Sequence, residues 1–223
     1  MSKFVLIDGH SILNRAFYGV PIFTNSEGLH TNAVFGFLNI MFKIIDSKQP
    51  DYMAVAFDVH QPTFRHEMFK DYKGTRKPMM EELREQVPVI KELLQKMNIT
   101  TVELPGYEAD DVIGTLSKKG EKAGMEVDVI SGDRDLLQLA SDHITICIPK
   151  TKKGQTTVEE YNTEGVRKLY KVTPTEFIDV KALMGDSSDN IPGVPGIGEK
   201  GATAIISQFG SIENAYDHAD EIS

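Results

Sequence analysis

The sequence predicts an α/β fold with a central, mostly parallel sheet, followed by a helical C-terminal region. Over residues 1–161, short strand-like apolar runs alternate with segments whose apolar residues recur at helical spacing, which is the pattern of a parallel sheet covered by helices. From residue 162 onward, helical patterns and tight turns rich in Gly and Pro take over. With 223 residues, 40% of them hydrophobic, the chain can bury one large core and carry a small appendage.

The expected elements of the core follow in a regular order. Strands are predicted at residues 4–7, 53–57, 100–104, 127–131 and 144–148, and helices at residues 32–46, 83–97 and 110–123. Pro88 lies inside the second of these predicted helices, residues 83–97, and is expected to kink it.

Residues 59–80 break the alternating pattern. They combine mixed charge with Pro and Gly, so we expect an exposed excursion from the core. Basic residues are concentrated there: Arg65, Lys70, Lys73, Arg76 and Lys77. Such a cluster is either an ordinary solvated face or a surface that contacts phosphate.

The C-terminal region carries a glycine-rich turn between two predicted helices. Thr173 and Pro174 suit the N-cap and first turn of a helix that reaches Met184, and a second helix is expected over residues 202–209. Between them, residues 190–201 would expose backbone N–H groups beside a helix N-terminus, which is a natural seat for phosphate. The turn also fits the dinucleotide fingerprint G-x-G-x-x-G, but no strand precedes it, so we reject a dinucleotide site.

Nine carboxylates follow strand-like runs or open helix-like ones. They are Asp8, Asp58, Glu108, Asp110, Asp111, Asp133, Asp135, Asp186 and Asp189. Any one of them could be a solvated helix cap. However, Asp8, Asp58 and Asp133 come directly after apolar runs, and parallel strands present ligand groups at their carboxyl ends. Acids gathered there would repel one another without cations, so the set predicts a site for Mg²⁺ or Mn²⁺, with two or more ions bound.

The net charge of −9 does not exclude a nucleic-acid partner. Removing the nine site carboxylates from the 33 Asp and Glu leaves 24, which equals the number of Lys and Arg. No apolar run approaches a membrane span, and no signal-peptide pattern follows Met1, so a cytoplasmic protein without a membrane partner is expected. Cys147, the single cysteine, is expected to be a buried small hydrophobe.

Six segments in order resemble the 5′ nuclease domain found at the N-terminus of bacterial DNA polymerase I, which belongs to the flap endonuclease superfamily. These segments are residues 5–9, 57–58, 72–76, 106–111, 131–135 and 185–193. The resemblance extends almost from end to end. It implies a PIN-like α/β core, a helical arch at about residues 59–80, and a C-terminal helix-hairpin-helix element that binds duplex DNA, often with K⁺ at the hairpin.

The resemblance also implies a domain plan and a reaction. Residues 1–161 would form the nuclease core and residues 162–223 the helical region, truncated at its C-terminus, in a monomer whose full-length form is fused to a polymerase. The expected activity is 5′-3′ exonuclease and flap endonuclease cleavage of DNA phosphodiesters in replication and repair. All nine carboxylates would surround two ions about 4 Å apart.

Further site residues are assigned by the same resemblance. Lys73 and Arg76 would stabilise the charge that develops on the scissile phosphate. The residues expected to contact branched, flapped or duplex DNA with a 5′ end are Tyr18, Arg65, Lys70, Lys77, Gly193, Gly196, Gly198 and Lys200. Tyr18 would stack on a terminal base; an aromatic packed in the core is the alternative for this residue.

Several other functions were weighed on the same residues. A PIN-type ribonuclease would usually lack the hairpin and the basic excursion, and a Mg²⁺-dependent phosphatase would have no use for the hairpin. A catalytically weak flap-binding module predicts missing acids, and none is missing. A standalone paralogue of the 5′ nuclease stays open, as do the assignment of carboxylates to individual ions, the balance of exonuclease and flap cleavage, and whether Ser223 is a natural end.

Overall fold

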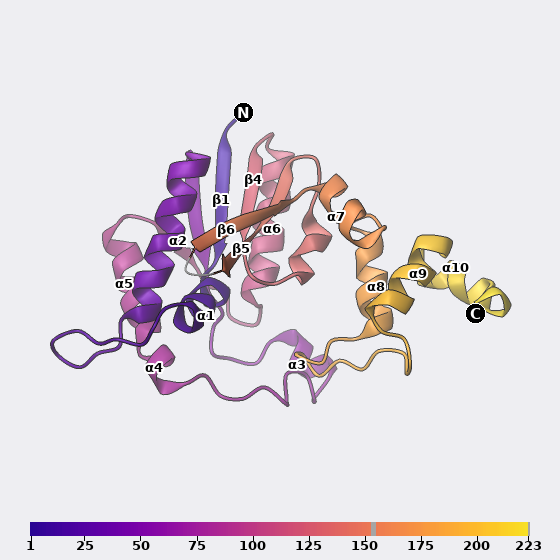
Figure 1. Cartoon of the computed structure of the whole chain (residues 1–223), viewed down its shortest axis with the longest axis horizontal. Coiled ribbons are helices and arrows are strands. Elements are labelled where there is room, and N and C mark those ends of the chain that lie inside the picture. Colours follow the sequence, from indigo (N-terminus) through magenta and orange to yellow (C-terminus); the bar gives the residue numbers. More distant parts are fainter. Residues whose placement is uncertain (153–154, 223) are drawn as a thin grey trace.

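The computed structural model describes residues 1–152 and 155–222 and has a six-stranded sheet at its centre (Figure 1). The strands are β1 (Lys3–Asp8), β2 (Tyr52–Ala56), β3 (Thr100–Val102), β4 (Glu126–Ile130), β5 (Ile144–Lys152) and β6 (Gln155–Tyr161), in the order β3-β2-β1-β4-β5-β6. All neighbours are parallel except β5 and β6. The predicted parallel core is confirmed, whereas the antiparallel edge strand β6 was not predicted.

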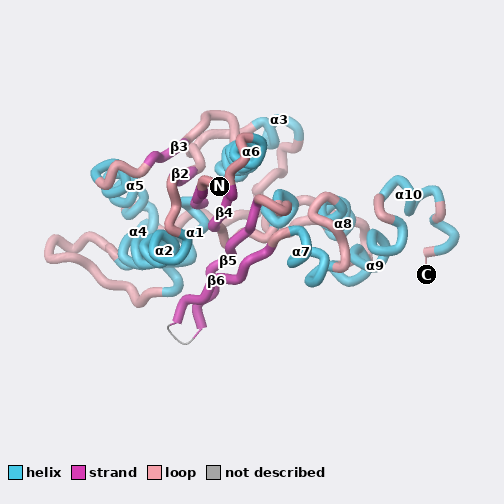
Figure 2. Tube along the Cα trace, turned by 90° about the horizontal axis from the view of Figure 1, so that it is seen from above, coloured by secondary structure: helices cyan, strands magenta, loops and turns pink. Residues whose placement is uncertain are grey.

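Helices cover both faces of the sheet, so the core has two halves (Figures 1 and 2). The helices α1 (Gly9–Gly19), α2 (Asn32–Lys48) and α5 (Gln86–Lys96) pack on one face, and α6 (Ala109–Lys122) packs on the other. Side chains alternate across each strand: Val5 and Ile7 join the first half, while Leu6 joins the second. Burial on both faces explains why the strands read as continuous apolar runs.

The helix prediction around Pro88 was wrong in detail. The apolar pattern belongs to two helices, α4 (Glu81–Arg84) and α5, which are separated at Glu85. Pro88 lies in the first turn of α5, where the missing N–H of proline has no intrahelical acceptor to lose. The break therefore precedes Pro88, and no kink is needed. Helix α1, which begins directly after Asp8, was not predicted.

The excursion of residues 59–80 is mostly irregular and crosses the molecule below the carboxyl ends of the strands (Figure 1). Its one helix is α3 (Phe64–Met68), so the helical content expected of an arch is small. Contacts to the C-terminal region hold it. The Asn190 side chain donates to the Asp71 carbonyl at 2.8 Å, and the Lys73 N–H donates to the Asp189 carbonyl at 2.9 Å.

The C-terminal region contains α7 (Thr163–Tyr170), α8 (Glu176–Met184), α9 (Glu199–Phe209), α10 (Ile212–Asp217) and the 3-10 helix η2 (Ala219–Glu221). The N-cap of α8 is Thr175 rather than the predicted Thr173. Thr173 still supports the start of the helix, since its hydroxyl accepts the Glu176 N–H and the Glu176 carboxylate accepts the Thr173 N–H. Helices α8 and α9 flank the expected hairpin. The predicted truncation at Ser223 lies outside the described residues.

Among the described helices, none has both the length and the apolar character needed to cross a membrane.

Candidate metal and nucleic-acid site

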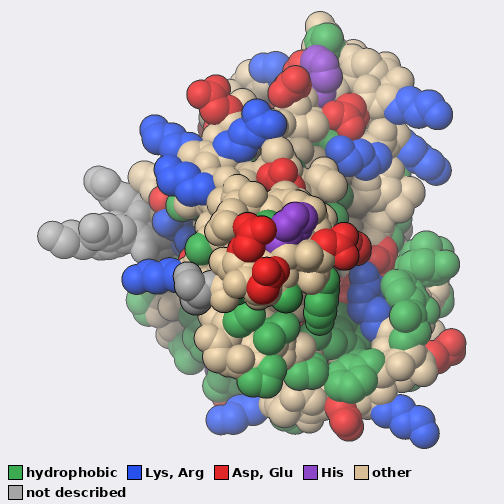
Figure 3. Space-filling model, turned by 90° about the vertical axis from the view of Figure 1, so that its right-hand side faces the viewer, with side chains coloured by type: hydrophobic (Ala, Val, Ile, Leu, Met, Phe, Trp, Pro, Cys, Tyr) green, Lys and Arg blue, Asp and Glu red, His purple; other side chains and the backbone are tan. Residues whose placement is uncertain are grey.

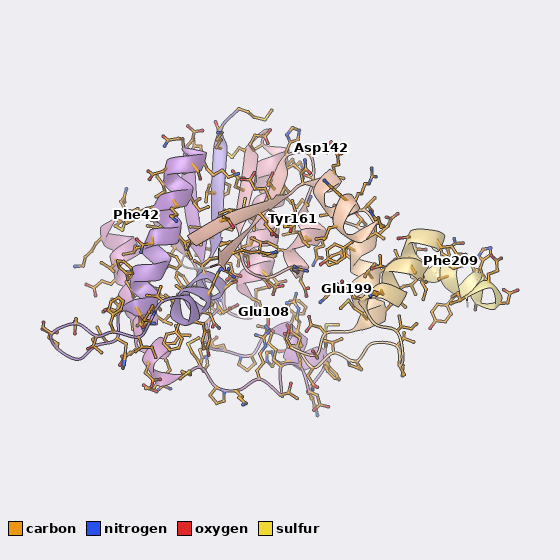
Figure 4. All side chains as sticks on the ribbon, in the orientation of Figure 1. Phe42, Glu108, Asp142, Tyr161, Glu199 and Phe209 are labelled. Atoms are coloured by element: carbon orange, nitrogen blue, oxygen red, sulfur yellow. The ribbon has the colours of Figure 1, made fainter. Side chains whose placement is uncertain are left out.

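A cleft of about 1080 Å³ opens where the carboxyl ends of the parallel strands meet. Asp8 ends β1, Asp58 follows β2 and Asp133 follows β4, so topology brings together acids that are far apart in sequence. Seven of the nine predicted carboxylates line this cleft: Asp8, Asp58, Glu108, Asp110, Asp133, Asp135 and Asp189. Figure 4 marks Glu108 between the sheet and the excursion. Asp111 and Asp186 lie outside the lining.

Asp8 is a buried acid and Asp110 a half-buried one, and both lack a basic partner. Within the described residues, neither takes part in an ion pair. The pKa of Asp8 is raised to about 6, mainly by burial and also by the Asp58 and Asp133 carboxylates, although the hydrogen bonds from Ser11 and Ser131 oppose the shift. Burial likewise raises the pKa of Asp110 well above its usual value, with the neighbouring carboxylates adding to the shift. This part of the cleft favours a cation.

The other acids are held by the chain's own cations. Lys73 Nζ lies 2.7 Å from Glu108 Oε1, and Arg76 pairs with Asp189. Lys181 Nζ lies 2.9 Å from both Asp135 and Asp186. These basic side chains neutralise carboxylates that were predicted to ligate metal.

The donor set suits hard divalent ions, because it consists of carboxylate oxygens. In the part of the chain that the structure describes, no three His, Cys, Asp or Glu side chains are arranged to ligate one ion as they stand. The uncompensated pair Asp8 and Asp110 fits a divalent cation, whereas binding at Asp135, Asp186 or Asp189 requires an ion pair to open.

Asp111 does not line the cleft, so its position differs from that expected of a metal ligand there. It accepts two hydrogen bonds from the Arg65 guanidinium, at 2.7 and 2.8 Å, and one from the Glu108 N–H at 3.0 Å. Burial opposes its charge, but these donors hold the pKa of Asp111 below its usual value. Asp111 therefore caps the start of α6 and anchors Arg65.

Several residues in or beside the cleft were missed by sequence reasoning. His10 Nδ1 accepts the Asp58 N–H at 3.1 Å, which fixes the loop after β2. The Tyr72 hydroxyl lies 3.0 Å from both Glu108 Oε2 and Asp189 Oδ2, so it bridges two predicted ligands. Lys181 was missed as well, although a basic residue shortly before Asp186 on the same helical pattern was a usable signal.

The basic residues of the excursion divide into two groups. Lys73 and Arg76 line the cleft. Lys73 has a left-handed backbone with φ of 56°, and this turn directs both side chains toward the acids. Lys70 and Lys77 are exposed and lie outside the cleft lining.

Tyr18 is not a core residue. Its side chain is 72% exposed, and its hydroxyl donates to Met80 Sδ at 3.7 Å. The core alternative for Tyr18 is therefore wrong, and an exposed ring is free to stack on a base.

The hairpin glycines are placed for different reasons. Gly193 packs against the backbone at the end of α8, where a Cβ would lie 2.5 Å from Gly185 N. Gly196 has φ of +86°, which favours glycine. Gly198 is the N-cap of α9 with open space where a Cβ would be, and Lys200 is exposed beside it. Figure 4 shows Glu199 on α9, well separated from Glu108.

The outer surface of the C-terminal region is mixed in charge (Figure 3). Acidic side chains gather near the centre of this face and basic side chains lie around it. The face is therefore not one continuous basic patch. Backbone N–H groups of the hairpin are better candidates for binding phosphate than a basic surface formed by side chains.

Comparison with protein families gives two matches that together span the chain. The family model described as the 5′-3′ exonuclease N-terminal resolvase-like domain matches residues 3–171. The model described as the 5′-3′ exonuclease C-terminal SAM fold matches residues 172–223.

Curated relatives include the DNA polymerase I proteins of Bacillus caldotenax and Streptococcus pneumoniae. The first is 54% identical over 220 residues and the second 44% identical over 222 residues. The chain spans 25% of the length of each.

Solved structures with the same fold include the T5 5′-exonuclease with bound zinc ions, with a TM-score of 0.76 and 26% identity, covering 97% of this chain and 79% of that one. A T5 flap endonuclease in a pseudo-enzyme-product complex with DNA and metal ions gives a TM-score of 0.76 and 27% identity, covering 96% and 78%. These likenesses agree with the predicted fold and family.

Proposed function

The chain belongs to the 5′-3′ exonuclease family, and from that premise we propose that it is a structure-specific 5′ nuclease. Its substrates would be branched or flapped DNA and duplex DNA with a 5′ end, cleaved as a 5′-3′ exonuclease and flap endonuclease in replication and repair. The full-length protein would carry a polymerase after this region and act as a monomer. The PIN-like core of residues 1–161 and the helical region of residues 162–223 would divide cleavage and duplex binding between them.

The single observation that carries this proposal is that Asp8 and Asp110, at the carboxyl edge of the sheet, are acids without a basic partner among the described residues. Their raised pKa values mark a place where negative charge is gathered without a basic partner among the described residues. Two or more Mg²⁺ or Mn²⁺ ions would be held by these and by Asp58, Glu108, Asp133, Asp135, Asp186 and Asp189, whereas Asp111 would anchor Arg65 beside them. When bound, such ions polarise the phosphate and lower the pKa of water.

Lys73 and Arg76 would bind the scissile phosphate. Both line the cleft from one turn of the excursion, where Lys73 pairs with Glu108 and Arg76 pairs with Asp189. A phosphate that enters there would replace these carboxylates as the partner of the two cations, which would then stabilise the charge that develops as the ester bond breaks. Arg65, which is paired with Asp111 and lies near Glu108, would contribute to phosphate binding there.

Residues outside the cleft would position the substrate. The hairpin with Gly193, Gly196 and Gly198 would hold the duplex through backbone N–H groups, with Lys200 beside it and K⁺ bound at the turn. The exposed ring of Tyr18 would stack on a terminal base, and the exposed Lys70 and Lys77 would contact phosphates along the excursion.

The test is Mg²⁺-dependent cleavage of a labelled 5′-flap DNA beside a matched RNA and an unbranched duplex. The proposal predicts cleavage near the flap junction and from the 5′ end, with little activity on the RNA. Preference for RNA would support a PIN-type ribonuclease instead. Flap binding without cleavage would support a binding module, and release of phosphate from simple monoesters alone would support a phosphatase.

A further inference from the structure

Lys181 joins two carboxylates that come from different parts of the chain. Its ammonium lies 2.9 Å from Asp135 Oδ1 and 2.9 Å from Asp186 Oδ2. Asp135 begins the 3-10 helix η1 (Asp135–Leu139) after β4, whereas Asp186 follows α8 in the C-terminal region. One ammonium therefore connects the α/β core to the helical region beside the cleft.

Hydrogen bonds from Ser188 fix the orientation of the Asp186 carboxylate. The N–H and the hydroxyl of Ser188 both donate to Asp186 Oδ1, at 2.8 and 2.6 Å, and this leaves Oδ2 for Lys181. The Lys181 side chain is only 24% exposed. The loop that carries Asp186 therefore orients its carboxylate toward the Lys181 ammonium.

The acids near the cleft differ in how their charge is compensated. Within residues 1–152 and 155–222, Asp8, Asp110 and Asp133 take part in no ion pair, whereas Asp135 and Asp186 share Lys181. A divalent ion that approaches Asp8 and Asp110 meets no resident cation. An ion that approaches Asp135 and Asp186 meets an ammonium already between them.

We propose that Lys181 is an internal counter-ion that takes the place of a divalent cation between Asp135 and Asp186 and moves aside when a metal ion binds there. The inference rests on the proposed metal site. Both cations cannot occupy this position, because Mg²⁺ approaches carboxylate oxygens to about 2.1 Å and would repel an ammonium in contact with the same groups. The flexible lysine stem allows the ammonium to withdraw into water.

Two consequences follow for the metal-free and metal-bound protein. Without metal, Lys181 keeps the core and the helical region connected at this point. With metal, the ion beside Asp135 and Asp186 binds more weakly than the ion beside Asp8 and Asp110, because it must first displace Lys181.

Calorimetric titration of the chelator-treated chain with Mn²⁺ tests this. Lys181→Met keeps most of the length of the side chain and removes its charge. It is expected to tighten the weaker class of Mn²⁺ sites by roughly three- to tenfold, which lies within the range for loss of the two partly exposed ion pairs of Lys181, and to leave the tighter class unchanged. Lys168→Met is the matched control, because Lys168 is exposed on α7 and the substitution removes the same charge.

The outcomes separate this inference from the proposed function. Mn²⁺ binding to the wild type with no tightening in Lys181→Met, or equal tightening in Lys168→Met, overturns the role of Lys181 and leaves the metal site standing. No Mn²⁺ binding to the wild type overturns both.

A second measurement uses the wild-type chain and does not depend on how a variant folds. Acetylation by an amine-reactive reagent, read residue by residue by mass spectrometry, is expected to rise several-fold at Lys181 when Mn²⁺ is added, while Lys168 stays constant. Equal or lower labelling of Lys181 with Mn²⁺ contradicts its displacement.

Discussion

The Ser131 hydroxyl donates a hydrogen bond to Asp8 Oδ2 over 2.8 Å and so ties the carboxyl end of β4 to that of β1. The other oxygen of Asp8 accepts the Ser11 N–H at 3.0 Å and caps α1. The side chain of Asp8 is therefore fixed by protein donors, yet it is buried beside other acids. Its charge must be balanced by a proton or by a bound cation.

In chelator, Asp8→Asn is expected to stabilise the protein at neutral pH. The pKa of Asp8 rises from 3.8 to about 6 on folding. As pH rises, the Asp8 carboxyl therefore loses its proton at a lower pH in the unfolded chain than in the folded protein. The contribution of Asp8 to the free energy of unfolding falls by about 2–3 kcal/mol between about pH 4 and about pH 6. Urea unfolding of both proteins across this pH range should show the wild type falling below the variant. Parallel curves would show that Asp8 is already compensated.

Asp110→Asn is expected to lower flap cleavage by about 100-fold or more while leaving flap binding intact or tighter. The substitution removes a negative charge that would help to hold the metal ion and would also repel the DNA phosphate. Single-turnover cleavage and equilibrium binding of the same labelled flap separate the two effects. Loss of binding in proportion to cleavage would point to a folding role for Asp110, which circular dichroism would then reveal.

Lys73→Ala is expected to reduce the single-turnover rate by about 100-fold or more and flap affinity by only a few-fold. The reason is that Lys73 lines the cleft, where in the proposed function it would meet the reacting phosphate. Lys43→Ala, on the exposed side of α2, removes the same charge away from the cleft and serves as the control. Equal losses of rate and affinity in Lys73→Ala would make this residue a simple phosphate anchor.

Gly198→Ala is expected to weaken binding of flaps with a long duplex and to lower the salt dependence of binding by about one phosphate contact. The position has an ordinary φ of −95° and open space around its Cβ, so the variant should fold. Cleavage of a short single-stranded 5′ end should change little. Gly114→Ala on α6, where a Cβ makes only ordinary contacts, is the matched glycine control. If both DNA substrates lose affinity alike, the hairpin is not a duplex clamp.

The positions of the acids could be predicted from the sequence, because strand ends can be recognised from local apolar patterns. Asp8, Asp58 and Asp133 follow apolar runs, and parallel topology then places them at one edge. Strand β6 could not be predicted in this way, because it pairs with its sequence neighbour β5 through its backbone and its mostly polar residues form no apolar run. Contacts between distant segments could not be predicted either.

The same reason explains why the charge balance of the site was not foreseen. The acids were treated as one repelling set, whereas Lys73, Arg76 and Lys181 neutralise part of it from segments that are remote in sequence. Nothing in local spacing indicates that Arg65 reaches Asp111 across 46 positions. Such pairs follow from the tertiary fold alone.

The most direct test of the account compares single-turnover cleavage of a 5′-flap DNA in Mg²⁺, in Ca²⁺ and in excess chelator, together with flap binding under each condition. The account predicts cleavage in Mg²⁺ alone and binding in both Mg²⁺ and Ca²⁺, because Ca²⁺ accepts looser ligand geometry than Mg²⁺. Cleavage that persists in chelator would contradict a metal-dependent reaction at the acids around Asp8 and Asp110.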